Sequence, residues 1–239
     1  MSAYKEESFD VIDEDNTEEQ IQQKIRLGFI RKVYGIIFFQ LLISTGVIYF
    51  SITSKFFYQF ILSNPSMLYL CIIGVLLTEI PILCCQSVAQ KVPLNYILLL
   101  IFTLCESYIM AYTTSYYEPL SVLICAALTL VIVIGLTLYA TFTKNDITIC
   151  GGALVSLSMI MLFLSIIGIF YTSAFYQTLV NSCGVFLFSL YLIYDIQLVI
   201  GKKKNLISTD NYIVGALMIY IDIVSIFIKI LMLFGKKKK

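Results

Sequence analysis

The stretch FLFSLYLIYDIQLVIGKKK, residues 186–204, decides the fold, because it combines a long apolar run with one acid and a lysine end. An apolar run of about 20 residues is the length of a helix that crosses a bilayer. Asp195 lies five residues before this run ends. An aspartate inside such a segment costs about 2.5–3.5 kcal/mol on insertion scales and usually faces protein rather than lipid. Asp195 is therefore predicted to have a functional role inside a helical membrane bundle.

The composition supports a membrane protein that is not an enzyme. Hydrophobic residues make up 59% of the 239 residues and charged residues 13%, against about 45–50% and 25% in soluble domains. The chain has no histidine, which excludes Ser–His–Asp and Cys–His catalysis and HExxH zinc helices. Its seven cysteines show neither a metal-ligand spacing nor a secreted disulfide pattern. We expect no enzymatic activity and no bound cofactor.

Seven apolar runs predict an all-α membrane protein, a bundle of seven hydrophobic helices. Because the bilayer core offers no water to backbone groups, such runs must be helices rather than an open sheet. The predicted crossings are residues 34–54, 67–88, 96–115, 119–142, 148–170, 175–200 and 211–234.

The chain outside these runs divides into short segments of distinct charge. Residues 1–20 are acidic and predicted to be a disordered cytosolic tail. Residues 21–33 form a basic, imperfectly amphipathic lead-in that is predicted to lie against the membrane surface. Residues 34–235 are then the transmembrane helical domain, and 236–239 are a lysine-rich C-terminus.

The basic residues next to the runs predict that the N-terminus is cytosolic. Nine of them fall on the N-terminal side: Lys24, Arg26, Arg31, Lys32, Lys91, Lys144, Lys202, Lys203 and Lys204. Only Lys55 falls on the other side, and positive charge favours the cytosolic face. Seven full crossings would carry residues 236–239 away from the cytosol, against the same rule. Either the last run is re-entrant, giving six crossings plus a returning segment, or it crosses fully and the lysines are tolerated.

The last run carries a polar stripe. Gly215, Asp222 and Lys229 recur every seven residues and share one helix face, which we expect to contact protein. The opposite, aliphatic side is expected to face lipid; it contains Leu217, Val224, Ile228 and Leu231. Lys229 lies two turns, about 10 Å, from Asp222, so the acid is expected to find its partner on another helix.

Asp195 is the candidate partner of Asp222, because the sixth and seventh runs are joined by only about ten residues. Tyr191 lies one turn from Asp195, and Ser225 lies on the Asp222 stripe, so both are candidate supporting residues. Two carboxylates in a low-dielectric site cannot both ionise cheaply, so the pair is expected to titrate as a unit. Such a pair is a proton sensor that needs no histidine. Doubly ionised, it is a hard-oxygen site suited to Ca²⁺.

Two further acids, Glu79 and Glu106, fall inside the second and third runs. Either acid is a candidate to line an ion path. The alternative is that each makes a local hydrogen bond between helices.

Five stretches in order along the chain carry a family resemblance. They are IRLGFIRKVYGIIFFQLL, VPLNYILLLIFTLCESY, LTLYATFTKNDITICGG, LFSLYLIYDIQLVIGKKKNLIS and DNYIVGALMIYIDIVSIFIKIL. With these stretches the chain resembles the Bax inhibitor family, in its lifeguard branch of transmembrane Bax-inhibitor-motif proteins.

The resemblance implies a pH-sensitive Ca²⁺ leak in endoplasmic-reticulum or Golgi membranes that lowers store calcium and protects against cell death. It assigns a di-aspartyl pH sensor to Asp195 and Asp222. Some relatives carry a basic residue eleven positions after the acid of the second helix, whereas this chain has Gln90 at that distance from Glu79. The expected partners are the lipid bilayer, Ca²⁺, protons and apoptosis-regulating membrane proteins, with no nucleic acid. The alternative function is a non-conducting membrane scaffold that regulates apoptosis or stress signalling through protein contacts.

Overall fold

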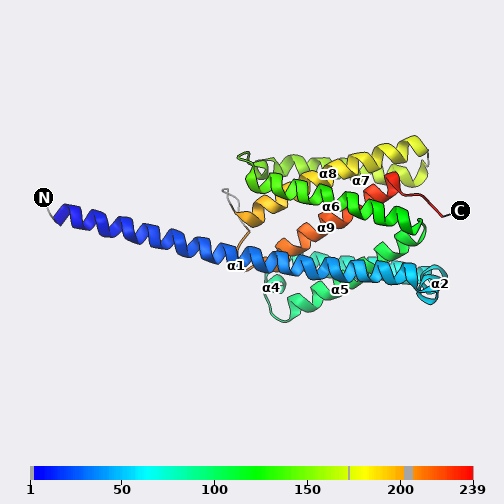
Figure 1. Cartoon of the computed structure of the whole chain (residues 1–239), viewed down its shortest axis with the longest axis horizontal. Helices are drawn as coiled ribbons and strands as arrows, with labels where there is room; N and C mark the ends of the chain where they lie inside the picture. The colour runs from blue at the N-terminus through cyan, green and yellow to red at the C-terminus, as the bar shows by residue number, and fades with distance from the viewer. Residues whose placement is uncertain (1–2, 172, 202–206, 239) are drawn as a thin grey trace.

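The computed structural model describes residues 3–171, 173–201 and 207–238, and side chains from residue 20 onward within these ranges. The helices lie roughly along one long axis (Figure 1). They are α1 (Ala3–Thr53), α2 (Lys55–Ser63), α3 (Pro65–Cys84), α4 (Gln86–Ala89), α5 (Leu94–Ser115), α6 (Pro119–Phe142), α7 (Gly151–Phe170), α8 (Ala174–Ile200) and α9 (Tyr212–Phe234), with a 3-10 turn η1 (Ile147–Cys150) before α7.

Within the described residues, seven helices are long and apolar enough to cross a membrane, which confirms the predicted helical bundle. They are α3, α5, α6, α7 with the preceding η1, α8, α9 and the part of α1 from Gln20 to Thr53. The connection after α1 is itself partly helical, since Ser54 begins α2 by accepting a hydrogen bond from the Phe57 amide at 3.3 Å. The second crossing ends at Cys84 rather than residue 88, three residues after the Pro81 that interrupts its ladder of backbone bonds.

Helix α1 differs from the sequence expectation, because it continues unbroken through residues 3–33. Extending an existing helix avoids the cost of nucleation, so polar residues with good helix propensity prolong it. Phe29 and Val33 are buried in the main core. Residues 21–33 are therefore continuous with the helix of the first crossing, and their placement against the membrane surface stays a prediction.

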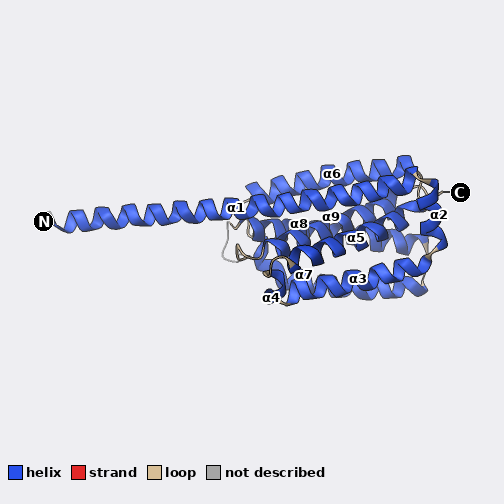
Figure 2. Ribbon diagram, turned by 90° about the horizontal axis from the view of Figure 1, so that it is seen from below, coloured by secondary structure: helices blue, strands red, loops and turns tan. Residues whose placement is uncertain are grey.

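Helix α9 is the central helix of the bundle. It packs against α1, α5, α6 and α8, and both views show it among these helices (Figures 1 and 2). The prediction that its aliphatic side faces lipid is wrong: Leu217, Val224 and Leu231 are buried against protein. A helix that is buried all round is apolar on every side, so hydropathy does not distinguish a lipid-facing side from a core-facing one.

The two ends of α9 lie at opposite ends of the bundle. At its start, Asn211 accepts a hydrogen bond from Gln90 at 2.9 Å and Tyr212 lies under the Lys32 ammonium. At its other end, the chain reaches the turn between α5 and α6, where Glu118 donates its backbone N–H to the Lys236 carbonyl at 2.8 Å. In the structure α9 therefore runs the whole length of the bundle, as in the full-crossing alternative.

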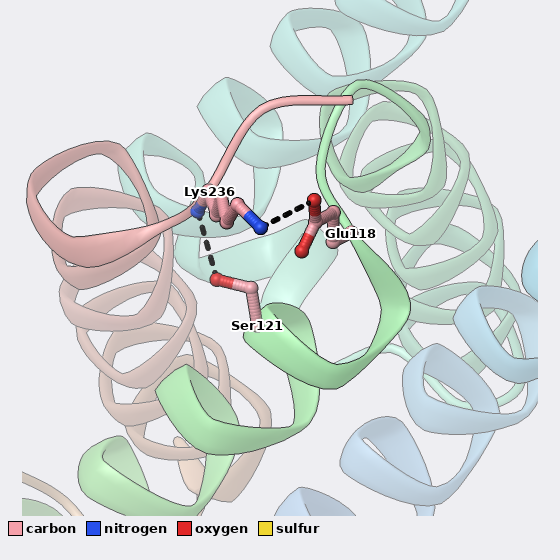
Figure 3. Close-up of polar contacts among 3 residues, drawn as sticks. All are labelled: Glu118, Ser121 and Lys236. Atoms are coloured by element: carbon pink, nitrogen blue, oxygen red, sulfur yellow. Dashed lines mark hydrogen bonds and ion pairs between the residues drawn. The ribbon is translucent and has the colours of Figure 1, made fainter. Parts of the chain in front are cut away.

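The C-terminal tail is held by specific contacts at that end. The Lys236 ammonium lies 2.9 Å from a Glu118 carboxylate oxygen, and the Lys236 amide donates to Ser121 Oγ at 2.8 Å (Figure 3). The Lys238 amide donates to the Tyr116 carbonyl at 2.9 Å, and its ammonium lies 4.4 Å from the Tyr58 ring centre. These contacts give the lysines of a fully crossing helix local partners.

The Glu118–Lys236 ion pair is expected to contribute little to stability. Its side chains are 38% and 70% exposed, and exposed pairs are worth less than about 1 kcal/mol. Glu118→Gln should therefore leave the detergent melting temperature nearly unchanged. Deleting residues 236–239 should lower it more, because two backbone hydrogen bonds are also lost. Equal destabilisation by the two changes would contradict the conclusion that the backbone hydrogen bonds of the tail contribute more than the ion pair.

Candidate functional site

Asp195 on α8 and Asp222 on α9 form a buried carboxyl pair. The two residues are 3% and 4% exposed, and their side chains are within hydrogen-bonding contact of each other. A carboxylate has no hydrogen to donate, so a hydrogen bond between the two groups requires one of them to carry a proton. The arrangement can therefore hold one shared proton inside the bundle.

The antiparallel register of α8 and α9 explains why these acids meet. Gly215 lies against Val199, and Gly184 lies against the Lys229 stem, so the polar stripe of α9 follows α8 along its length. Helix α9 begins ten residues before Asp222, whereas α8 ends five residues after Asp195. The start of α9 therefore extends about five residues, or about 8 Å of helix rise, beyond the end of α8. This displacement brings the two acids to the same depth.

The surroundings of the pair offer few compensating groups. Asp195 Oδ1 and Asp222 Oδ2 are buried without a hydrogen-bond donor. Among the described residues, no lysine or arginine forms an ion pair with either carboxyl group. Because a buried, unpaired charge is costly, sharing one proton removes one of the two negative charges that a fully ionised pair would carry without a cationic partner.

The predicted supporting residues lie near the pair but do not bond to it in the described part of the chain. Tyr191 and Ser225 are half-buried and make no hydrogen bond to either carboxyl group there. Lys229 lies with its aliphatic stem against Gly184, two turns from Asp222. Tyr194 was not predicted: it lies within electrostatic reach of Asp195 and its hydroxyl touches Gly151 of α7. Its position directly before Asp195 in the sequence was the one indication that Tyr194 lies near the pair.

Glu79 and Glu106 form a second acidic location, separate from the aspartate pair. They lie on α3 and α5 and interact electrostatically with each other. Glu106 also acts on Tyr220 of α9. The structure therefore brings the two glutamates near one another but not into the Asp195–Asp222 pair.

A polar seam between α1, α5 and α9 was missed by sequence reasoning. We define it as Gln40, Ser44, Thr103, Ser107 and Tyr220, all less than 4% exposed. Gln40 Nε2 donates to Thr103 Oγ1 at 3.1 Å, and Ser44 Oγ lies 2.9 Å from Ser107 Oγ and 2.6 Å from the Tyr220 hydroxyl. The available signal was the four-residue spacing of two polar pairs within apolar runs, which places each pair on one helix face.

Arg26 ties the end of α8 to α1. Its guanidinium donates to the Leu198 carbonyl at 2.5 Å and to the Ile207 carbonyl at 2.6 Å. It also lies against Gly201, the left-handed residue that ends α8 with φ of 75°. A cation is favourable at a helix C-terminus, where carbonyl groups lack partners. Arg26 thus fixes the helix end that follows Asp195.

The pair by itself is a poor resident Ca²⁺ site. Ca²⁺ takes six to eight oxygen ligands, and the described residues contain no group of three or more His, Cys, Asp or Glu side chains arranged for a metal. Two carboxyl groups in mutual contact fit transient contact with a passing cation better than a permanent cage.

Fold and site together define a multi-pass membrane protein with an ionisable pair in its interior. The family model described as "Inhibitor of apoptosis-promoting Bax1" matches residues 26–239, and the chain belongs to this Bax inhibitor family. It is 35% identical over 219 residues to Protein lifeguard 3 of Mus musculus, covering 90% of this chain and 71% of that protein. The Homo sapiens protein of the same name is also 35% identical, with 90% and 70% covered. Protein LIFEGUARD 3 of Arabidopsis thaliana is 31% identical, with 87% and 84% covered.

Proposed function

We propose that this protein is a pH-sensitive Ca²⁺ leak channel of intracellular membranes, in which the Asp195–Asp222 pair is the proton sensor. The observation that carries the proposal is the contact between two buried carboxyl groups on neighbouring helices. Losing the shared proton leaves two negative charges side by side in a dry site, where like charges repel strongly. The repulsion pushes α9 away from α8.

The central position of α9 supports a gating role for this movement. Because α9 contacts α1, α5, α6 and α8, a shift of this helix changes several interfaces at once. Packed interfaces have discrete alternative arrangements, so a small local change produces an open or a closed form. In cells, the leak lowers store calcium and thereby protects against death, a role in keeping with membership of a family of inhibitors of apoptosis-promoting Bax1.

The leak is tested with purified protein in liposomes that contain a Ca²⁺ dye. We expect protein-dependent Ca²⁺ entry whose rate changes with pH, and no entry into protein-free liposomes. Ca²⁺ entry equal to that of protein-free liposomes at every pH would contradict the channel. If the protein nevertheless protects cells and keeps store calcium unchanged, it is a scaffold rather than a channel.

The proposed location is the endoplasmic reticulum or Golgi, with a cytosolic N-terminus. Six described basic residues lie in or next to the bundle end from which α9 starts: Lys24, Arg26, Arg31, Lys32, Lys91 and Lys144; residues 202–204 lie outside the described ranges. With α9 crossing fully, nine basic residues lie on the N-terminal side of the membrane, and Lys55 and the four lysines of the tail lie on the other side. The charge rule therefore still favours this orientation.

Selective permeabilisation tests this orientation. A tag before residue 1 should be accessible to antibody when only the plasma membrane is opened. A tag after residue 239 should become accessible only when the internal membranes are opened too. Accessibility of both tags under the first condition would show that α9 does not cross fully.

A further inference from the structure

Tyr220 and Asp222 link two separate polar sites through one helix. Two residues along a helix turn the side chain by about 200°, so Asp222 faces α8 while Tyr220 faces α1 and α5. Tyr220 is fully buried, its ring packs edge-on against Phe102 with centres 6.0 Å apart, and its hydroxyl lies 2.6 Å from Ser44 Oγ. Any displacement of α9 that separates the aspartates therefore also moves this tyrosine.

The serines that hold Tyr220 have alternative acceptors on their own helices. Ser44 Oγ lies 2.9 Å from the Gln40 carbonyl, and Ser107 Oγ lies 2.5 Å from the Thr103 carbonyl. When the tyrosine leaves, each serine hydroxyl still donates to a carbonyl one turn back, a bond that serine commonly makes inside helices. Opening the contact therefore leaves neither serine hydroxyl without a partner.

The seam also presents oxygen atoms with free acceptor capacity. Gln40 Oε1 is buried without any hydrogen-bond donor, although the residue is only 3% exposed. The hydroxyl oxygens of Ser44 and Ser107 lie 2.9 Å apart in the same seam. Glu106 interacts electrostatically with Tyr220. Glu79 of α3 interacts electrostatically with Glu106. Amide, hydroxyl and carboxylate oxygens are the ligands of hard cations such as Ca²⁺.

We propose that Tyr220 is the gate of a cation path between α1, α5 and α9, and that Gln40 Oε1 with the Ser44 and Ser107 hydroxyls contacts the passing cation. In the closed form the Tyr220 ring and hydroxyl fill the seam. In the open form α9 has moved away, and the freed oxygens face the path. The inference rests on the proposed leak function and names the residues through which the ion passes.

Tyr220→Phe tests the gate because it keeps the ring and removes the hydroxyl. One hydrogen bond lost from the closed form shifts a two-state equilibrium by about two- to tenfold. We expect Ca²⁺ entry into liposomes to rise by about that factor at the pH where the wild type is least active. The matched control is Tyr176→Phe, which removes a 2.6 Å hydrogen bond to the Leu164 carbonyl far from the seam and should leave Ca²⁺ entry unchanged.

Gln40→Leu tests the path itself. The substitution keeps the side-chain volume nearly constant and removes the free oxygen, so we expect a severalfold lower maximal Ca²⁺ flux in the fully open condition. The matched control is Gln177→Leu, which removes an amide contact to the Gly168 carbonyl and should retain wild-type flux.

The outcomes separate this inference from the proposed function. A wild-type protein without any leak would overturn both. A wild type that leaks in a pH-dependent way, with Tyr220→Phe and Gln40→Leu behaving like their controls, would overturn the gate and leave the channel standing. If Tyr220→Phe does not fold, Phe102→Leu weakens the edge-on ring contact that holds Tyr220 in the closed form without removing a path oxygen, and it must also raise Ca²⁺ entry at that pH.

Discussion

Replacing Asp222 by asparagine is expected to abolish most of the pH dependence of Ca²⁺ entry into liposomes. Asparagine keeps the shape and the hydrogen bond but cannot gain or lose a proton in this range. If one shared proton controls the helix pair, wild-type entry changes by at most about tenfold per pH unit. In Asp222→Asn the change in Ca²⁺ entry per pH unit should fall below about twofold.

Asp195→Asn should give the same result, because either substitution removes the like-charge pair. The double variant should resemble the single ones, since groups that titrate as a unit are not additive. Asp210→Asn is the matched control: Asp210 lies exposed in the connection between α8 and α9, and its loss should leave the pH response unchanged. A full pH response in either single variant would place the sensor elsewhere.

Gly201→Ala is expected to cause the largest loss of stability. Gly201 has φ of 75°, and a Cβ atom there would lie 2.5 Å from Arg26 Nε. A left-handed conformation costs about 1–2 kcal/mol for a residue with a side chain. Displacing Arg26 also weakens its bonds to the Leu198 and Ile207 carbonyls, each worth about 1.5–3 kcal/mol when the donor is charged. We expect a total loss of about 3 kcal/mol or more, measured as a lower denaturation midpoint in detergent.

Gly35→Ala is the control for this prediction. A Cβ atom at Gly35 of α1 meets nothing within 4 Å, and alanine is a better helix former than glycine by about 0.5–1 kcal/mol, so this variant should be unchanged or slightly more stable. Arg26→Ala should reproduce much of the Gly201→Ala loss, because it removes the same two bonds. Equal stability of the Gly201→Ala and Gly35→Ala proteins would contradict the stabilising role of Gly201 and Arg26 at the end of α8.

The sequence predicted the helical bundle well because long apolar runs in a membrane protein have one stable backbone form. It also singled out Asp195 and Asp222, since a charge in an apolar run is conspicuous. The sequence does not give the relative depths of the two acids, because the start of α9 relative to α8 depends on the connection between them. Here Arg26 and Gly201 shape the beginning of that connection.

Other features depended on tertiary contacts that the sequence pattern does not reveal. Leu217 and Val224 are buried in the core, but lipid and protein interiors are equally apolar and select the same residues. Ser44 and Tyr220 gave weak signals for a similar reason: neutral polar residues are common in membrane helices, and only the packing of α1, α5 and α9 shows that they meet.

The central claim is that Asp195 and Asp222 hold one proton between them in a buried site, and infrared spectroscopy of the purified protein tests it most directly. A protonated carboxyl group has its own C=O absorption, distinct from that of a carboxylate. The account predicts one such band that disappears as the pH is raised and is missing from the difference spectra of both Asp195→Asn and Asp222→Asn. A titrating band that persists in both variants, or no titrating band in the wild type, would contradict it.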